Sequence, residues 1–381
     1  MRGQIDYTNR VDMRRFSGYD AVELKAAVID MLKEFGLEDK LRAAGNAMIK
    51  PNMVAGRDPA LGVTTHPELI KAIVLALAEY VPAGNIIIAD SPGGPVSDGI
   101  LKSFYGTCGY TDVAKETGAK LGFDQSTATL HSKTRKYEFV ACAAEAGFIV
   151  NAAKLKTHTF TLMSGAVKNM FGCLPGLNKT EYHALYPDKE DFGGMLCDLC
   201  DTLAPDLSVI DGILGMEGNG PTGGKARAFG CLIASPNPFA ADLAGAAVLG
   251  LNPEEIVTAA RSMKLGYVPS SADKLEYTAE KPEAFAVENL LYPDTHVRMK
   301  ALITRTGGFY RRYLTPRPAV NAKCVGCGLC VKSCPKKIVS IKGKKACIAP
   351  AECIKCYCCQ ELCPKHAIDA KKPALARLFR M

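Results

Sequence analysis

The 381-residue sequence has no apolar stretch long enough to cross a membrane as a helix. Its longest apolar runs are 69–81, which is interrupted by Lys71 and Glu79, and 231–251, which contains two prolines and Asp242. The N-terminal segment carries charges throughout and lacks the apolar core of a secretory signal. We therefore expect a cytoplasmic protein without a transmembrane segment.

Acidic residues are scarce in the C-terminal part of the chain. Residues 295–381 contain 19 Lys and Arg but only 3 Asp and Glu, whereas residues 1–294 contain 28 and 36. This change of charge predicts a domain boundary near residue 295. Because no nucleic-acid-binding motif and no alternation of aromatic and basic residues accompanies the charge, we expect no nucleic-acid partner.

The most informative residues that the sequence does contain are its 16 cysteines. In a chain without a secretion signal, they indicate metal ligation or thiol chemistry rather than disulfides. Two runs with the spacing C-x2-C-x2-C-x3-C-P begin at Cys324 and Cys353. Three cysteines of each run wrap one iron–sulfur cubane while the fourth ligates the other, so the spacing predicts two [4Fe-4S] clusters. A zinc site, the alternative, is typical of separate CxxC pairs.

The predicted cluster ligands form two sets, which we name by their order in the chain. The first set is Cys324, Cys327, Cys330 and Cys363, and the second set is Cys353, Cys356, Cys359 and Cys334. Between the two runs, a small hairpin around Gly343 is predicted to pack on the clusters. Cys358 breaks the two-residue gap and is predicted to be a neighbour of the second set rather than a ligand. Cys347 is predicted to be a core residue of the hairpin.

Three cysteines outside the runs are candidates for thiol chemistry. Cys197 and Cys200 share one face of a predicted helix, and this pattern favours burial in the core over a redox dithiol. Cys173 follows Phe171-Gly172 in a turn-like segment and is the better candidate for a reactive thiol, although a structural role is favoured for it too.

Short β-rich runs alternate with amphipathic stretches through the first 295 residues. Buried strands are predicted at 47–54, 85–91, 148–153, 207–211 and 229–235. Helix start signals lie between them, such as the threonines before Pro67. This alternation predicts an α/β domain at 1–295, with a large mixed or parallel sheet and flanking helices. A basic connector at 296–318, a small α+β two-cluster ferredoxin module at 319–372 and a basic tail at 373–381 complete the predicted organisation.

Polar residues gather at the ends of the predicted strands. Because side chains alternate along an extended chain, Lys154, Lys156 and His158 are predicted to share one face. Open α/β sheets bind ligands at strand ends, and these groups suit a carboxylate or a phosphate. The predicted substrate-binding residues are Lys50, Asn52, Asp90, Lys154, Lys168, Asn169, Asp211 and Glu217, and the predicted catalytic residues are Lys156 and His158, with His158 as proton donor. The alternative is that the lysines face solvent or pair with Asp90 and Asp211.

Residues 218–223 match the dinucleotide pattern G-x-G-x-x-G, but another predicted strand follows them. The dinucleotide site instead needs a helix whose N-terminus meets the pyrophosphate. A Walker A loop is excluded as well, because Asn219 and Ala226 occupy positions that require Gly and Ser or Thr. Residues 215–224 are therefore predicted to form a ligand-facing loop with Glu217 as its acidic group.

Five segments of the chain resemble a family known as domain of unknown function 362, which is often joined to a two-cluster ferredoxin module. They are IKPNMVAG at 49–56, GVTTHPELIKAI at 62–73, ADSPGG at 89–94, and the stretches 151–179 and 209–224. The cysteine-rich segment itself resembles bacterial two-cluster ferredoxins. The resemblance implies an iron–sulfur protein of unsettled activity and supplies no catalytic residues. His158 and Lys168, followed by Pro175-Gly176, are also similar to the cofactor-binding segment of lactate racemases, which implies phosphate or carboxylate binding there.

Two classes of function follow from these patterns. The leading hypothesis is an oxidoreductase in which two [4Fe-4S] clusters pass electrons to an anionic small-molecule substrate in the α/β domain. The alternative is a non-catalytic electron carrier. Its basic region 298–345, which has no acidic residue, would dock on an acidic ferredoxin, flavodoxin or redox enzyme. Whether an organic cofactor also binds is left open by the sequence.

Overall fold

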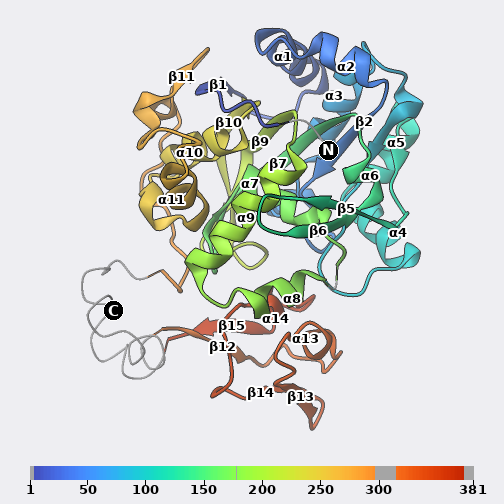
Figure 1. The fold of residues 1–381 in the computed structure, drawn as a ribbon. Helices are drawn as coiled ribbons and strands as arrows, with labels where there is room; N and C mark the ends of the chain where they lie inside the picture. The colour runs from blue at the N-terminus through green and yellow to red at the C-terminus, as the bar shows by residue number, and fades with distance from the viewer. Residues whose placement is uncertain (1–3, 177, 297–314, 373–381) are drawn as a thin grey trace.

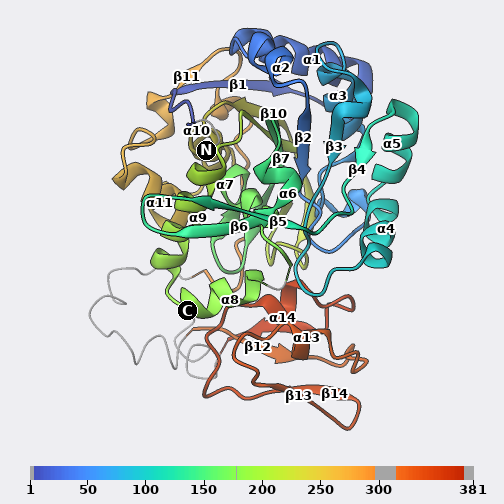
Figure 2. The ribbon, with the colours of Figure 1, turned by 45° about the vertical axis from the view of Figure 1, so that its right-hand side comes forward.

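The structure of the chain is a computed structural model that describes residues 4–176, 178–296 and 315–372. A large α/β domain lies next to a small C-terminal module (Figures 1 and 2). Within the described ranges, no helix is both long and apolar enough to span a membrane. The predicted basic connector at 296–318 falls mostly, and the predicted basic tail at 373–381 entirely, outside the described residues.

A nine-stranded mixed sheet forms the centre of the α/β domain. Its order is β11 (Glu276–Tyr277), β1 (Arg10–Arg15), β10 (Lys225–Ser235), β9 (Leu207–Glu217), β7 (Phe148–His158), β2 (Ala47–Pro51), β3 (Ile86–Ile88) and β4 (Lys120–Leu121), with β8 (Leu162–Ser164) paired to β7. Strands β9, β7, β2, β3 and β4 run parallel, whereas β10 is antiparallel to both β9 and β1. The predicted large mixed sheet is confirmed.

Helices cover both faces of this sheet, and each face has its own hydrophobic core (Figure 2). One face carries α1 (Ala21–Glu34), α2 (Glu38–Ala44), α3 (Pro67–Leu77), α4 (Asp98–Thr107) and α5 (Tyr110–Thr117). The other carries α6 (Ala141–Ala144), α7 (Ala166–Asn169), α8 (Asn178–Leu185), α9 (Lys189–Leu203), α10 (Pro238–Val248), α11 (Val257–Lys264) and the hairpin of β5 (Thr127–His131) and β6 (Lys136–Val140). Short 3-10 turns lie at Pro59–Leu61, Ala83–Asn85, Met170–Cys173, Pro253–Glu255, Ala272–Lys274 and Pro282–Ala284.

Helix α3 begins where the sequence predicts, but with a different capping residue. Pro67 occupies its first turn, as expected. The cap is His66, whose Nδ1 accepts the N–H of Glu68 at 3.3 Å. Thr65 instead accepts the backbone N–H of Asn52 at 2.9 Å and donates to a backbone carbonyl of β7 at 2.8 Å. This threonine therefore ties the segment after β2 to β7, next to the polar residues of the predicted site.

The connection predicted as a loop at 215–224 is shorter in the structure. Strand β9 continues to Glu217 and β10 begins at Lys225, so that only residues 218–224 connect them. The carboxylate of Glu217 accepts a hydrogen bond from Arg227 Nη1 at 2.7 Å. Glu217 is therefore a strand residue with its own ion pair rather than the acidic group of a loop. Another strand, and no helix, follows residues 218–223, which agrees with the absence of a dinucleotide fingerprint.

The C-terminal module is a small α+β unit, as predicted. In it β12 (Arg317–Val320) pairs with β15 (Ile368–Lys371), β13 (Val339–Lys342) pairs with β14 (Lys345–Ile348), and the short helices are α13 (Leu329–Lys332) and α14 (Cys358–Glu361). The predicted hairpin turns at Gly343 and Lys344, which both have positive φ, as two-residue hairpin turns require. Because β12 begins at Arg317, the module starts inside the predicted connector.

Candidate functional site

A polar cavity of about 90 Å³ lies between the α/β domain and the C-terminal module. Side chains from the ends of β2 and β7, from the segment after β3, and from α7, α8 and α14 form its wall. Six predicted site residues line it, namely Lys50, Asn52, Asp90, Lys156, Lys168 and Asn169. The other four, His158, Lys154, Asp211 and Glu217, are not among the residues that line it.

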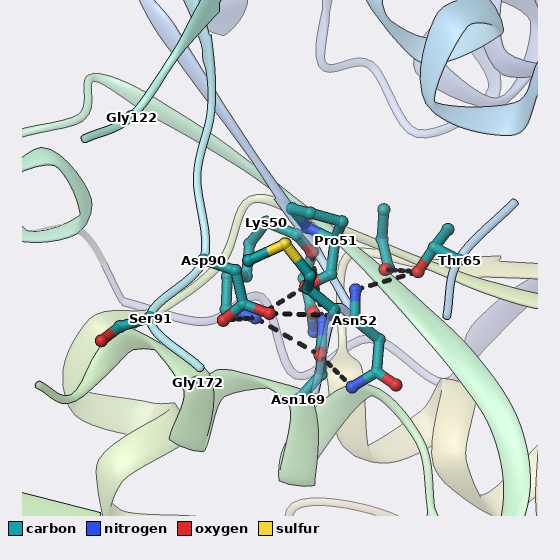
Figure 3. Close-up of polar contacts among 12 residues, drawn as sticks. Lys50, Pro51, Asn52, Thr65, Asp90, Ser91, Gly122, Asn169 and Gly172 are labelled. Carbon is teal, nitrogen blue, oxygen red and sulfur yellow. Dashed lines mark hydrogen bonds and ion pairs between the residues drawn. The ribbon is translucent and has the colours of Figure 1, made fainter. Parts of the chain in front are cut away.

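Lys50 and Asp90 form a buried ion pair in the wall of this cavity (Figure 3). Lys50 Nζ lies 2.9 Å from Asp90 Oδ1, and Asp90 Oδ2 accepts the backbone N–H of Met53 at 2.9 Å. Gly172 packs directly against the pair, because a Cβ at this position would lie only 2.5 Å from Lys50 Nζ. For Lys50, the structure thus shows the pairing with Asp90 that was the alternative to ligand binding.

Two asparagine side chains link this ion pair to the neighbouring strands (Figure 3). Asn169 Nδ2 donates to Lys50 O at 3.1 Å and to Asn151 Oδ1 at 2.8 Å. Asn169 Oδ1 accepts Asn52 Nδ2 at 2.9 Å, and Asn52 Oδ1 accepts Lys156 Nζ at 2.5 Å. Each asparagine side chain in this network both donates and accepts a hydrogen bond. The network therefore fixes the side-chain oxygen of Asn52 toward Lys156.

Three further lysines at the cavity, Lys156, Lys168 and Lys179, form no ion pair with a carboxylate in the part of the chain that the structure describes. Lys179 donates to the carbonyl of Ser91, and Lys156 Nζ donates to Val63 O at 2.6 Å. Burial lowers the pKa of Lys179 to about 8. Burial, together with repulsion from Lys168, lowers the pKa of Lys156 well below its ordinary value. These shifts arise mainly because burial takes the ammonium groups out of water, which disfavours their charged form.

His183 adds a neutral polar group to the same cavity. Its ring stacks on Phe192 with a centroid distance of 4.3 Å and meets the edge of Phe171 at 5.9 Å. Burial lowers the pKa of His183 to about 3, so the imidazole is neutral at pH 7. Its Nδ1 is buried and has no hydrogen-bond partner among the described residues. The aromatic rings thus hold the imidazole in place, while no described residue forms a hydrogen bond with its Nδ1.

His158 lies behind the cavity wall and acts on it through Glu361. His158 Nε2 lies 3.1 Å from Glu361 Oε1, within ion-pair distance but not aligned as a good hydrogen bond, while Nδ1 accepts the N–H of Phe160 at 2.9 Å. Burial lowers the pKa of His158 to about 4, so the ring is neutral with its proton on Nε2. Burial favours the neutral acid of Glu361, but His158 and nearby cations outweigh it and lower the pKa of Glu361 to about 2. This geometry suits a positioning role for His158 rather than the predicted direct proton donation.

Lys154 and Asp211 form a second buried ion pair, outside the cavity. Lys154 Nζ lies 2.7 Å from Asp211 Oδ2, and both side chains have no exposed surface. Asp211 also accepts the hydroxyl of Tyr19 at 2.8 Å and the N–H of His66 at 3.0 Å. The register of β7 with β9 places Lys154 opposite Asp211 and then shifts before Lys156. Lys154 therefore does not join Lys156 at the cavity.

The four thiols of the first set surround one small cavity of about 20 Å³ in the C-terminal module. Burial, followed by repulsion from the other three thiols of the set, raises the pKa of Cys330. The backbone N–H groups of Ala346 and Ala367 donate to Cys324 Sγ at 3.4 Å and to Cys363 Sγ at 3.2 Å. Hydrogen bonds to the sulfurs are among the features that tune iron–sulfur clusters. The first set therefore fits the ligand requirements of a [4Fe-4S] cluster.

The thiols of the second set also lie close together. Burial raises the pKa of Cys353, and the nearby Cys356 and Cys334 raise it further. Cys359 experiences burial and repulsion from the same set. Cys356 and Cys359 are buried, whereas Cys327 of the first set is exposed. The second set is therefore the inner one, and the first set lies toward solvent.

Helix α14 connects the second set to the polar cavity, and it lies beside α8 in both ribbon views (Figures 1 and 2). The helix contains Cys359, while Cys358, Glu361 and the following Leu362 line the cavity. Thr222 of the α/β domain donates to Glu361 O at 3.4 Å. One residue of the second set, Cys359, and two residues that close the cavity, Cys358 and Glu361, thus belong to one turn of helix.

Cysteines outside the two predicted ligand sets differ in burial. Cys173, Cys197 and Cys200 are buried, and burial raises the pKa of each thiol, to about 12 for Cys173. Such thiols are poor nucleophiles at neutral pH, which agrees with the structural roles favoured from the sequence. The prediction that Cys347 is a core residue was wrong, because on β14 its side chain points to solvent. Cys358 is buried beside Cys359.

Two known protein families match separate parts of the chain, one in the α/β domain and one in the C-terminal module. The model of the family "Domain of unknown function (DUF362)" matches residues 48–247, slightly more than half of the chain. This chain belongs to the DUF362 family. The "4Fe-4S binding domain" model matches residues 320–340 of this DUF362 protein, a segment that holds the first cysteine run. The protein is therefore an iron–sulfur electron-transfer protein.

A curated relative of this DUF362 protein is the thylakoid-associated protein sll1697 of Synechocystis. The two sequences are 31% identical over 294 residues, which cover 74% of this chain and 88% of the relative. The shared region is long enough to include most of the DUF362 domain. The name of the relative states an association with thylakoids and no chemical activity.

Three residues with charged or imidazole side chains that line the cavity were not predicted as site residues from the sequence. Lys179 and His183 lie on α8 of the DUF362 domain, and Glu361 lies between two cysteines of the second run. Lys179 has a weak signal, because it ends the family segment 151–179. His183 and Glu361 have none, since only the docking of the C-terminal module against α8 brings them to one cavity.

Proposed function

We propose that this DUF362 protein binds two [4Fe-4S] clusters, one in each cysteine set, and that it is an oxidoreductase acting on a small anionic molecule in the polar cavity. The observation that carries the proposal is helix α14, because it supplies Cys359 to the second set and Glu361 to the cavity wall. A [4Fe-4S] cluster takes up and releases one electron at a time. A molecule in the cavity would lie against the helix that holds the second set.

The exposure of the two sets supports a direction for the electrons. Cys327 of the first set is exposed, whereas Cys356 and Cys359 of the second set are buried. The exposed set suits contact with an electron donor, and the buried set suits transfer into the cavity. Electrons would enter at the first set and leave at the second.

The residues of the cavity divide into binding, proton-donating and positioning groups. Lys156 and Lys168 suit the binding of an anion, because neither forms an ion pair with a carboxylate in the described chain. Lys179 suits proton donation, since a pKa of about 8 lies near the operating pH. Asn52 holds Lys156, and His158 positions Glu361 at the wall. An anionic substrate would thus be held and protonated on the side of the cavity that faces α14.

The test is anaerobic purification of the full chain, followed by counting of iron and sulfide and reduction with dithionite. Two clusters require about eight irons per chain. Small anionic compounds are then screened for oxidation of the reduced protein, followed by visible absorbance. A compound that oxidises the wild type but not Lys168→Met, while both keep the same iron content, supports the proposal.

The matched control is Lys225→Met, because Lys225 is an exposed lysine of β10 outside the cavity. If Lys168→Met and Lys225→Met are oxidised at the same rate, the cavity is not the site of reaction. An iron content of about four per chain would instead contradict the second cluster.

A second candidate function is that of an electron carrier, and the surface around the first set favours it. Val325, Leu329 and Ile341 are large apolar side chains that line the cavity of the first set and are exposed by 59%, 36% and 40%. The exposed lysines among the described residues of the same module are Lys323, Lys332, Lys336, Lys337, Lys342, Lys344, Lys345, Lys365 and Lys371. An apolar centre with a cationic rim suits the acidic surface of a small ferredoxin or flavodoxin.

Rates of electron exchange with such an acidic protein, measured from low to high salt, test this candidate. The rate should fall steeply with ionic strength, because salt screens exposed charges. The variant Lys345→Glu should slow the exchange, whereas Lys225→Glu, on the other domain, should not. A rate that is indifferent to salt removes the docking argument. If only redox proteins oxidise the reduced clusters, the carrier function replaces the oxidoreductase.

A further inference from the structure

The polar cavity carries an excess of positive groups. Its charged lining residues are Lys50, Lys156, Lys168, Lys179, Asp90 and Glu361, which are four lysines and two carboxylates. With all of these groups ionised, the wall has two positive charges more than negative charges. Asp90 already compensates Lys50 at 2.9 Å. The excess therefore falls on the lysines that form no ion pair in the described residues.

The cavity is also incomplete in its hydrogen bonds. His183 lies in the wall and has 5% of its surface exposed. Its Nδ1 is buried and has no hydrogen-bond partner among the described residues. A buried polar atom without a partner costs about 1–3 kcal/mol, so proteins rarely keep one without a reason. A ligand with a hydrogen-bonding group would satisfy it.

The size of the cavity limits the ligand. A volume of about 90 Å³ is well below the roughly 300–1,000 Å³ of sites for drug-sized molecules. It suits a molecule, or one end of a molecule, with only a few non-hydrogen atoms. Gly172 leaves room for the Lys50–Asp90 pair in this wall, because a Cβ there would lie 2.5 Å from Lys50 Nζ.

We infer that the cavity binds a small dianion of the dicarboxylate or phosphate class, held by Lys156, Lys168 and Lys179. The inference deepens the proposed function, on which it rests for the role of the bound molecule in electron transfer. Two negative charges would neutralise the excess of the wall, whereas a monoanion leaves one buried charge uncompensated, which is costly in a buried site. Lysine ammonium groups are common ligands of phosphate and carboxylate oxygens.

The pKa shifts of the lysines agree with this inference. Burial and the neighbouring cations lower the pKa values of Lys156 and Lys179. The charged or titratable groups that face these two lysines are Lys50, Asp90, Lys154, Lys168, Cys173 and Glu361. A bound dianion favours the protonated lysines, so binding should take up protons and weaken as the pH rises above about 8.

The experiment is a calorimetric titration of the oxidised, anaerobically purified full chain with sulfate, malonate, acetate and chloride at constant ionic strength. Sulfate and malonate, which are both dianions at pH 7.5, should bind saturably and at least tenfold more tightly than acetate and chloride. Titrations in two buffers of different ionisation enthalpy should show proton uptake. Equal binding of dianions and monoanions, or no saturable binding of either, overturns the inference.

The variant Lys168→Met should weaken the binding of the dianions by about tenfold to a hundredfold, because it removes a charge-assisted hydrogen bond. Lys168→Arg should restore most of the affinity, which a general loss of folding would not allow. Lys225→Met is the matched control and should bind as the wild type does. If Lys168→Met binds dianions as tightly as Lys225→Met does, the assigned site is wrong.

Failure of this inference can be told apart from failure of the proposed function, because the titration uses oxidised protein in which no electron moves. Dianion binding without any oxidation of the reduced protein by small anions refutes the proposed function alone. Oxidation of the reduced protein by a small monoanion, without tighter binding of dianions, refutes the present inference alone.

Discussion

Lys154 and Lys156 lie two residues apart on β7 and are both buried. Among the described residues, only Lys154 has an acidic partner. Lys154 Nζ lies 2.7 Å from Asp211 Oδ2, and Tyr19 and His66 occupy the remaining sites of that carboxylate. Lys156 donates only to neutral oxygens and faces the cavity. One strand therefore carries a satisfied buried charge and an unsatisfied one.

Lys154 and Lys156 therefore differ in whether their charge is available to a ligand. A buried ion pair whose lone pairs are all used leaves nothing for another molecule to bind. Burial lowers the pKa of both lysines, and the pKa of Lys156, which has no ion-pair partner among the described residues, lies well below its ordinary value. A buried lysine without a counter-ion costs stability. Such a cost is typical of binding sites, where a ligand supplies the missing charge. We therefore propose that Lys154 stabilises the fold and that Lys156 is available to bind a ligand.

The largest effect that tests this comparison is the loss of stability on removing each lysine. Lys154→Met should lower the free energy of unfolding by about 3–5 kcal/mol, because Asp211 is left buried without a cation. Lys156→Met should lower it by less than about 2 kcal/mol, since relief of an unpaired buried charge offsets the lost hydrogen bonds. Anaerobic denaturant unfolding followed by circular dichroism measures both. The double variant Lys154→Met/Asp211→Leu should recover most of the loss, and equal losses in the two single variants would refute the comparison.

Asp242 is a buried carboxylate that forms no ion pair with a cation among the described residues. It accepts the N–H groups of Ala166 at 2.5 Å and Val167 at 3.2 Å, at the start of the helix that carries Lys168, and burial raises its pKa to about 7. The folded protein thus keeps the proton of Asp242 up to about pH 7, whereas the unfolded chain releases it near pH 4. This group should therefore make the protein less stable as the pH rises, by about 2 kcal/mol between pH 5 and pH 7.

The check is the free energy of unfolding of the wild type and of Asp242→Asn at pH 5 and pH 7. The substitution removes the titration of residue 242, so the variant should lose about 2 kcal/mol less than the wild type over this range. All other titrating groups cancel in this difference. An identical pH dependence in both proteins would show that Asp242 does not titrate in this range.

The smallest of the expected effects concerns the packing around Lys50 and Asp90. Gly172→Ala should destabilise the protein by about 1–3 kcal/mol, because the new Cβ would lie 2.5 Å from Lys50 Nζ and 2.6 Å from Asp90 Oδ1. Gly84→Ala is the matched control, since nothing lies within 4 Å of its Cβ position. Thermal unfolding of the two variants measures the difference. If both unfold at the same temperature, the ion pair is not packed as tightly as the structure shows.

The central strands of the sheet were predicted from the sequence alone. Each of the five predicted runs overlaps an observed strand, because a buried strand is a continuous apolar run between turn residues. The edge strand β11 and its neighbour β1 were not predicted. Their pairing depends on chain segments that are far apart in sequence, as Arg10 and Glu276 are. Local patterns do not record such pairings.

The candidate site was predicted in part. Lys50, Asn52 and Lys156 meet because neighbouring parallel strands end at one edge of the sheet, which the order of elements already indicates. Lys154 was assigned to the same site because it lies on the same face of β7 as Lys156. The regular register of β7 with β9 places Lys154 opposite Asp211, and the register shifts only between Lys154 and Lys156. A sequence pattern does not reveal where such a shift occurs.

The sequence by itself determined the iron–sulfur chemistry, since cysteine spacing is a local property and the 4Fe-4S match covers the first run. It also determined the class of the fold, because apolar runs and turn residues are local too. Only the tertiary structure decided which buried lysines meet a carboxylate, and that α14 closes the cavity with Glu361. Burial and ion pairing depend on strand register and on the docking of the two domains, and these are set by contacts between residues far apart in the chain.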